Sequence, residues 1–204
     1  MELLLASSNP KKIVELRALL APHGIRMLVP ADVGGLPEVD EDQPTFAGNA
    51  RKKARAAALA TGRWALADDS GLEVDALGRL PGVRSARFAG GHGDDEGNNR
   101  HLLALLAGIP PEGRGARFVC AIALSDPSGR IDFEAEGTAR GRILETPRGE
   151  RDFGYDPLFL FTEEGHSATG RGFAELASDE KSAVSHRGRA LRSLLDRLSQ
   201  RTSA

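Results

Sequence analysis

The stretch LLLASSNPKKIVELRALLAPHG, residues 3–24, contains the features that decide the fold. It opens with a short apolar run of the kind that forms a buried strand. A polar turn follows, in which Asn9 is a good N-cap residue and Pro10 suits the first position of a helix. Apolar residues then recur at helical spacing until Gly24. The chain therefore opens as a strand, a polar turn and a helix, which is typical of an α/β fold.

The same analysis extends along the rest of the chain. We expect strands at residues 25–29, 64–67, 72–76, 141–144 and 158–161, a hairpin over 116–138, and helices at 45–61, 99–107 and 178–198. Residues 68–71 are a predicted polar turn, and 78–97 are predicted to be rich in loops. No repeat or linker divides the chain, so residues 1–204 are expected to form one domain of the α/β class with a mixed sheet.

The composition excludes several classes of protein. Of the 204 residues, 40% are hydrophobic and 27% are charged, which excludes a disordered tail or a fibre. No apolar run approaches the ~18 residues that span a bilayer, so we expect no membrane partner. The net charge of −2 argues against binding to a nucleic-acid polymer. The single cysteine, Cys120, permits no intrachain disulfide, and with no secretory signal we expect a cytoplasmic location.

Two lysine-containing segments are candidates for binding phosphate. The first is the turn before the first helix, where backbone N–H groups and two lysines favour an anion. The second is the helix at 45–61, on which Asn49 and Lys53 share a face because they are four residues apart. The alternatives are a capped helix with solvated lysines and a solvated helix face.

Adjacent carboxylates at the end of a predicted central strand suggest a magnesium site. Mg²⁺ prefers oxygen ligands, and Asp68 and Asp69 would point to opposite sides of the sheet. Glu41, in an acidic loop, is a candidate second ligand. The alternatives are a turn stabilised by aspartate side chains and a solvated acidic loop. For the polar residues 92–97 we expect only a solvated surface loop.

Aromatic and basic residues near the C-terminus are candidates for binding a base. Phe153 lies beside a glycine and can offer a flat face, with a core aromatic in a turn as the alternative. His186 and Arg187 are donors that can reach a carbonyl oxygen, and Lys181 precedes them. The alternative for this last segment is a solvated amphipathic helix.

Together these segments resemble the inosine/xanthosine triphosphate pyrophosphatase family. The resemblance runs nearly from end to end and rests on six segments in the family's order. These are 5–12 (LASSNPKK), 45–50 (TFAGNA) with Lys53, 67–72 (ADDSGL), 81–87 (PGVRSAR), 153–157 (FGYDP) and 180–188 (EKSAVSHRG).

The resemblance implies an enzyme that hydrolyses non-standard purine nucleoside triphosphates (ITP, dITP and XTP) to the monophosphate and pyrophosphate, with Mg²⁺ as cofactor. It implies that Asp69 is the catalytic residue and that Glu41 and Asp69 hold the metal. It also implies a homodimer with an elongated mixed β-sheet flanked by helices, in two lobes with a cleft between them. The implied substrate-binding residues are Ser7, Ser8, Asn9, Pro10, Lys11, Lys12, Lys53, Ser70, Phe153, Gly154, Tyr155, Asp156, Lys181, His186 and Arg187.

Discrimination between purine bases should depend on the group at position 6 of the ring. A keto oxygen there would pair with a donor from His186, Arg187 or a backbone N–H, and adenine would leave that donor without a partner. Two departures from the family pattern stand out: Gly48 replaces the usual Glu, and residues 150–152 replace a glycine-rich run. Three alternatives stay open: a pyrophosphatase for another nucleotide, an RNA-binding module that uses the arginine-rich last helix, and a nucleotide sensor without activity.

Overall fold

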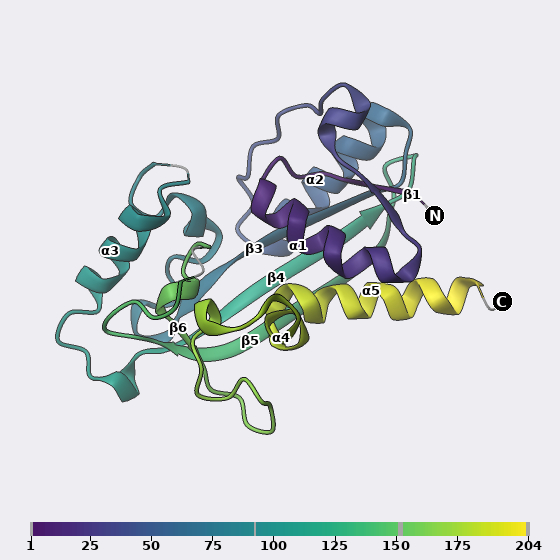
Figure 1. Cartoon of the computed structure of the whole chain (residues 1–204). Coiled ribbons are helices and arrows are strands. Elements are labelled where there is room, and N and C mark those ends of the chain that lie inside the picture. Colours follow the sequence, from purple (N-terminus) through teal and green to yellow (C-terminus); the bar gives the residue numbers. More distant parts are fainter. Residues whose placement is uncertain (1, 92, 151–152, 203–204) are drawn as a thin grey trace. The chain divides into compact units, whose positions relative to one another are not determined.

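The computed structural model describes residues 2–91, 93–150 and 153–202 (Figure 1). Residues 150–152 depart from the glycine-rich run of the family pattern, and two of them, Arg151 and Asp152, lie outside the described residues. The strands are β1 (Glu2–Leu5), β2 (Arg26–Leu28), β3 (Ala65–Val74), β4 (Gly115–Ser125), β5 (Ile131–Ile143) and β6 (Phe159–Phe161). The α-helices are α1 (Pro10–Leu20), α2 (Phe46–Thr61), α3 (Asp95–Leu105), α4 (Ser178–Val184) and α5 (His186–Thr202).

The strands form one sheet in the order β2-β1-β3-β4-β5-β6. β1 runs parallel to both β2 and β3, whereas β5 and β6 are antiparallel. This mixture confirms the predicted α/β class with a mixed sheet. Among the residues that the structure describes, no helix is long and apolar enough to cross a membrane.

The chain forms two compact units, and β3, β4 and β5 each pass from one unit into the other. Unit one comprises Met1–Asp69, Cys120–Gly137 and Gly188–Ala204. Unit two comprises Ser70–Val119 and Thr138–Arg187. Each unit has its own buried apolar cluster.

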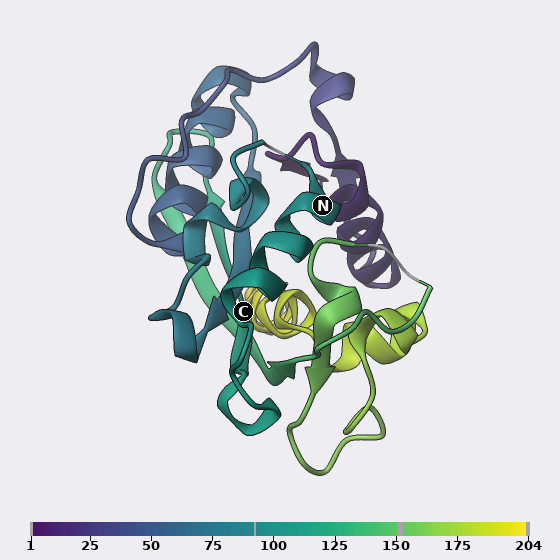
Figure 2. The same cartoon turned by 90° about the vertical axis from the view of Figure 1, so that its left-hand side faces the viewer.

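In unit one, helices cover both faces of the strands (Figure 2). Leu16 and Leu20 of α1 and Leu191 and Leu194 of α5 are fully buried and pack with Leu66 on one face. The opposite face meets α2, which buries small residues: Ala50, Ala54, Ala57 and Ala58. Thr45 caps α2 by accepting the Gly48 N–H at 3.1 Å, and Gly62 ends the helix with a φ of +64°. Alanines allow α2 to approach the sheet closely, which matters for the polar residues described below.

In unit two, the core is aromatic. Phe118 lies 4.6 Å from Phe159 and 5.7 Å from Phe173, measured between ring centroids. Leu102 of α3 is fully buried in the same cluster. Arg114 is also buried, and its guanidinium donates to the carbonyl oxygens of Leu106, Ile109 and Leu144. This arginine therefore joins the end of α3 and the segment after it to Leu144, the residue that follows β5.

The structure corrects two local predictions. Residues 68–71 are not a turn, since β3 continues through them. The two aspartates stay extended because lysines on the flanking helices neutralise them. α3 begins at Asp95 rather than at residue 99, because Asp94 accepts the Gly97 N–H at 2.8 Å. The predicted surface loop at 92–97 is therefore wrong for residues 95–97, and residue 92 lies outside the described residues.

Candidate active site

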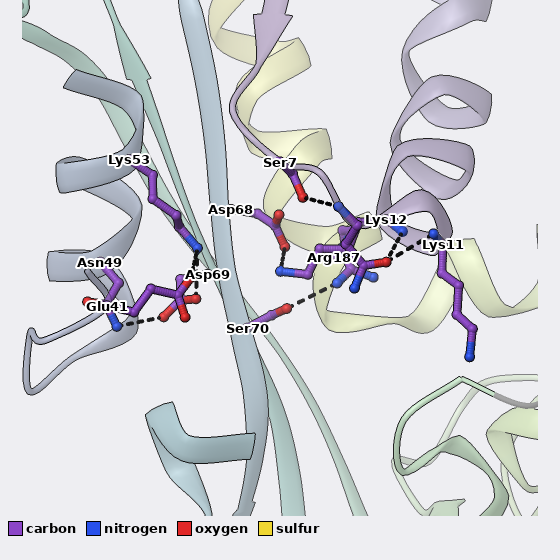
Figure 3. Close-up of polar contacts among 11 residues, drawn as sticks. Ser7, Lys11, Lys12, Glu41, Asn49, Lys53, Asp68, Asp69, Ser70 and Arg187 are labelled. Carbon is purple, nitrogen blue, oxygen red and sulfur yellow. Dashed lines mark hydrogen bonds and ion pairs between the residues drawn. The ribbon is translucent and has the colours of Figure 1, made fainter. Parts of the chain in front are cut away.

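Asp68 and Asp69 point to opposite faces of β3, as the alternation of a strand requires (Figure 3). Asp69 faces α2, where Lys53 Nζ lies 3.0 Å from its Oδ1 and Asn49 Nδ2 donates to its Oδ2 at 3.1 Å. Asp68 faces α1, where Lys12 Nζ lies 2.9 Å from its Oδ2. The two neighbouring carboxylates therefore have different surroundings.

The carboxylates of Glu41 and Asp69 both contact the ammonium group of Lys53. Lys53 Nζ lies 2.7 Å from Glu41 Oε1 as well as 3.0 Å from Asp69 Oδ1. Burial raises the pKa of Asp69, the charge of Lys53 lowers it and that of Glu41 raises it, so that the net shift is upward. Burial opposes the charge on Lys53, yet the neighbouring carboxylates outweigh it and raise the pKa of Lys53. The ammonium group is therefore firmly charged, and Asp69 is a stronger base than an ordinary aspartate.

Asn49 is a residue to which the sequence analysis gave no role of its own. Its side chain is fully buried, with Oδ1 accepting the Gln43 N–H at 3.0 Å while Nδ2 donates to Asp69. Asn49 thus joins Asp69 to the acidic loop that carries Glu41. The available signal was its spacing of four residues from Lys53, which placed both side chains on one face of α2.

Lys52 holds the same loop from the adjacent position of α2. Its Nζ lies 2.9 Å from both the Asp40 carbonyl oxygen and Asp42 Oδ1. The adjacent lysines therefore have different partners: Lys52 fixes the backbone of the acidic loop, and Lys53 contacts Glu41. This anchoring locates Glu41 opposite Asp69.

The carboxylate pair of Glu41 and Asp69 fits a magnesium ion. Within the described part of the chain, no cluster of three or more His, Cys, Asp or Glu side chains could hold a metal. Mg²⁺ commonly uses only one or two carboxylates and completes its shell with water and substrate phosphates. The oxygens of this pair already converge on the ammonium of Lys53, so their arrangement suits a cation.

The segment before α1 is exposed and ordered by its own side chains. Asn9 Oδ1 accepts the N–H groups of Lys11 and Lys12 at 3.0 and 3.2 Å, which confirms the predicted N-cap. Ser7 Oγ accepts the Asn9 N–H at 3.3 Å. Ser8 and Pro10 are exposed, as is Lys11. A ligand at this turn would therefore meet lysine and serine side chains together with a helix start that is already partly capped.

In unit two, two cations contact one aromatic ring. Lys181 Nζ lies 5.1 Å and Arg187 Cζ 5.6 Å from the centroid of the Phe153 ring. Lys181 also forms an ion pair with buried Asp156, and Arg187 Nη2 donates to Ser70 Oγ at 3.0 Å. We call the following residues the base group: Phe153, Gly154, Tyr155, Asp156, Lys181, His186 and Arg187.

Two members of the base group are turned into the core of unit two. Tyr155 is buried and its hydroxyl donates to the Ser85 carbonyl oxygen at 2.9 Å. Burial raises the pKa of Tyr155, and the negative charge of Asp95 adds to the shift. His186 is also buried and stacks on Phe118 with the centroids 4.7 Å apart. For Tyr155, the alternative of a core aromatic in a turn describes what the structure shows.

Gly48 leaves the carboxylate pair intact. A Cβ at this position would lie 2.8 Å from Gln43 Cβ, so the side chain of Gln43 occupies the space beside the glycine. Glu41 and Asp69 still converge on Lys53. With glycine at position 48, the side chain of Gln43 lies close to α2, and both carboxylates contact Lys53.

The sequence and the fold are both similar to those of known proteins. A model of the Ham1 family matches residues 3–197. The dITP/XTP pyrophosphatase of Desulforamulus reducens is 50% identical over 200 residues, which cover 98% of this chain and 96% of the relative. The enzyme of the same name from Corynebacterium efficiens is 50% identical, with 98% of each chain covered.

The solved structure of a HAM1 protein from Coxiella burnetii has a TM-score of 0.86 and 38% identity, with 98% of this chain and 99% of that chain covered. These similarities extend over all the segments on which the resemblance rests, and they confirm it. With its sequence matched from residue 3 to residue 197 and its fold matched over nearly its whole length, the chain belongs to the Ham1 family.

Proposed function

We propose that this protein is a nucleoside-triphosphate pyrophosphatase that hydrolyses ITP, dITP and XTP to the monophosphate and pyrophosphate. The observation that carries the proposal is that the carboxylates of Glu41 and Asp69 both contact the ammonium group of Lys53. This arrangement occurs in a chain that is 50% identical to a protein named dITP/XTP pyrophosphatase. Cleavage of a phosphoanhydride requires little covalent chemistry from the protein, so positioned charges suffice.

Asp69 is the proposed catalytic residue because its environment holds the carboxylate in one orientation. Asn49 and Lys53 each hold one of its oxygens, so the carboxylate cannot rotate freely. Held in this way, the carboxylate would position the attacking water for reaction. Mg²⁺ held by Glu41 and Asp69 would supply positive charge close to the phosphate oxygens.

Unit one also contains the proposed phosphate-binding residues. These are Ser7, Ser8, Asn9, Pro10, Lys11, Lys12 and Lys53. Their contribution is mainly electrostatic: lysine is a compact charge that suits phosphate, and the start of α1 adds the positive end of a helix dipole. Asp68 forms an ion pair with Lys12 and so holds that lysine beside β3.

The base group of unit two is proposed to recognise the purine. Phe153 offers a ring for stacking. Arg187 beside it, His186 or a backbone N–H would donate to a keto oxygen at position 6. Inosine and xanthosine carry that oxygen, whereas adenine carries an amino donor. A buried donor left without a partner disfavours the wrong base by as much as ~10⁴.

The test is a substrate panel. Purified protein is mixed with Mg²⁺ and, separately, with ITP, XTP, dITP, ATP and GTP, and the release of pyrophosphate and orthophosphate is measured. We expect pyrophosphate from the first three substrates, little from the last two, and none in the presence of EDTA. Orthophosphate would contradict cleavage between the α and β phosphates. Binding without any product would indicate a sensor. The homodimer and the cytoplasmic location stay predictions.

A further inference from the structure

Two side chains of α3 hold both backbone polar groups of one residue of the base group, Gly154. Asp95 Oδ2 accepts the Gly154 N–H at 3.0 Å. Asn99 Nδ2 donates to the Gly154 carbonyl oxygen at 2.9 Å. Asp95 and Asn99 are four residues apart and therefore lie on one face of α3. α3 thus holds Gly154, which is more than 50 residues away in the sequence. These two hydrogen bonds are called the grip on Gly154 below.

The gripped glycine is the point at which the direction of the chain changes. Gly154 has a φ of +57°, which a residue with a side chain rarely adopts. Phe153, on one side, lies near the cations of Lys181 and Arg187. Tyr155, on the other side, is buried and its hydroxyl donates to the Ser85 carbonyl oxygen. The position of Gly154 therefore determines where the Phe153 ring is presented.

We propose that Asp95 and Asn99 are positioning residues for the purine base, acting through Gly154 on Phe153. The proposal rests on the proposed function of the base group. A loop that is already held in place loses less conformational freedom when its ligand binds, so the grip lowers the cost of binding. The carboxylates proposed for catalysis, Glu41 and Asp69, belong to unit one, whereas Asp95, Asn99 and Gly154 belong to unit two, so we expect the chemical step not to depend on Asp95 and Asn99.

The first experiment separates binding from chemistry. Asp95→Ala and Asn99→Ala are compared with the parent enzyme for ITP hydrolysis. We expect KM to rise on the order of tenfold in Asp95→Ala, which loses a hydrogen bond to a charged group, and about fivefold in Asn99→Ala, which loses a neutral one, with kcat within about twofold in both. Asp95→Asn keeps an oxygen acceptor for the Gly154 N–H and should recover most of the parent KM. An unchanged KM in both alanine variants would overturn the proposal.

Asn98→Ala is the matched control. Asn98 is the buried neighbour on α3, and its Oδ1 accepts the Ala89 N–H at 2.7 Å, away from the base group. It should lower the melting temperature and leave KM unchanged. A rise in KM equal to that of Asn99→Ala would show a general effect of weakening α3 and would overturn the proposal.

The second experiment needs no substrate. Hydrogen exchange of residues 153–158 is followed by mass spectrometry in the parent and in Asp95→Ala. We expect faster exchange in the variant because the Gly154 N–H loses its acceptor. Unchanged exchange would overturn the grip itself. If exchange accelerates but the parent enzyme does not turn over ITP, the grip stands as a structural feature, and the proposed function fails together with the role in base binding.

Discussion

Asp68 and Asp69 are neighbours in β3, yet their carboxylates form ion pairs with lysines on different helices. Asp68 contacts Lys12 on α1, whereas Asp69 contacts Lys53 on α2. The alternation of a strand separates them, and the helix on each face supplies a cation. One carboxylate can therefore fix a proposed phosphate-binding lysine while the other carries the proposed chemistry.

Removing the amide of Asn49 should reduce catalysis. In Asn49→Ala, Asp69 Oδ2 and the Gln43 N–H both lose a buried partner. We expect kcat to fall by a factor on the order of ten to a hundred and the free energy of unfolding to fall by about 2 kcal/mol. Steady-state kinetics and urea unfolding measure the two effects. Full activity in the alanine variant would exclude a role in orienting Asp69.

The pKa of Asp69 should report on both Lys53 and the metal. In metal-free protein we expect that pKa to lie above the ~3.9 of an ordinary aspartate, because burial dominates. Lys53→Met should raise it further, since the charge of Lys53 is the main influence that lowers it. Addition of Mg²⁺ should lower it, because a bound cation favours the ionised form. Carboxyl ¹³C NMR follows all three titrations, and insensitivity to Mg²⁺ would contradict Asp69 as a ligand.

Gly48 and Gln43 should be energetically coupled. A Cβ at Gly48 would overlap Gln43 Cβ, so Gly48→Ala alone should lower the free energy of unfolding by about 1 kcal/mol. In a Gln43→Gly background the overlap disappears, and the same substitution should raise that free energy by up to about 1 kcal/mol because alanine favours the helix. Chemical denaturation of the four proteins in the cycle tests this, and purely additive effects would rule out the contact.

Gly71 should tolerate no side chain. A Cβ there would lie 2.7 Å from the Gly82 carbonyl oxygen and 2.3 Å from Ser85 Oγ. We expect Gly71→Ala to lower the free energy of unfolding by about 3 kcal/mol, because backbone atoms would have to move. Gly91→Ala, at an open position, is the control and should be nearly neutral. Equal melting temperatures for the two variants would refute the close approach.

Local signals in the sequence predicted much of the fold. Asn9 caps α1 as expected, and α2 ends at Thr61 as expected, because helix ends depend on residues next to each other in the chain. The prediction failed at residues 68–71, where charges normally favour a turn. They lie in a strand because Lys12 and Lys53, distant in the sequence, neutralise them.

The candidate site could be predicted only as residue types. Glu41 and Asp69 were expected to act as a pair, but their meeting at Lys53 depends on how the acidic loop packs on α2. Asn49 lay on the expected face of that helix, yet its bridge to Gln43 is a tertiary contact. The grip of Asp95 and Asn99 on Gly154 had no local signal, since it joins segments that lie far apart in the chain.

The most direct test of the account is the pyrophosphate released from ITP by the parent protein and by Asp69→Asn, each with Mg²⁺ and each confirmed to be folded. The substitution keeps the shape of the side chain and removes its charge and its basicity. We predict pyrophosphate and IMP from the parent enzyme and a decrease in kcat on the order of a thousandfold or more in the variant. Comparable pyrophosphate release by both proteins would contradict the role of Asp69.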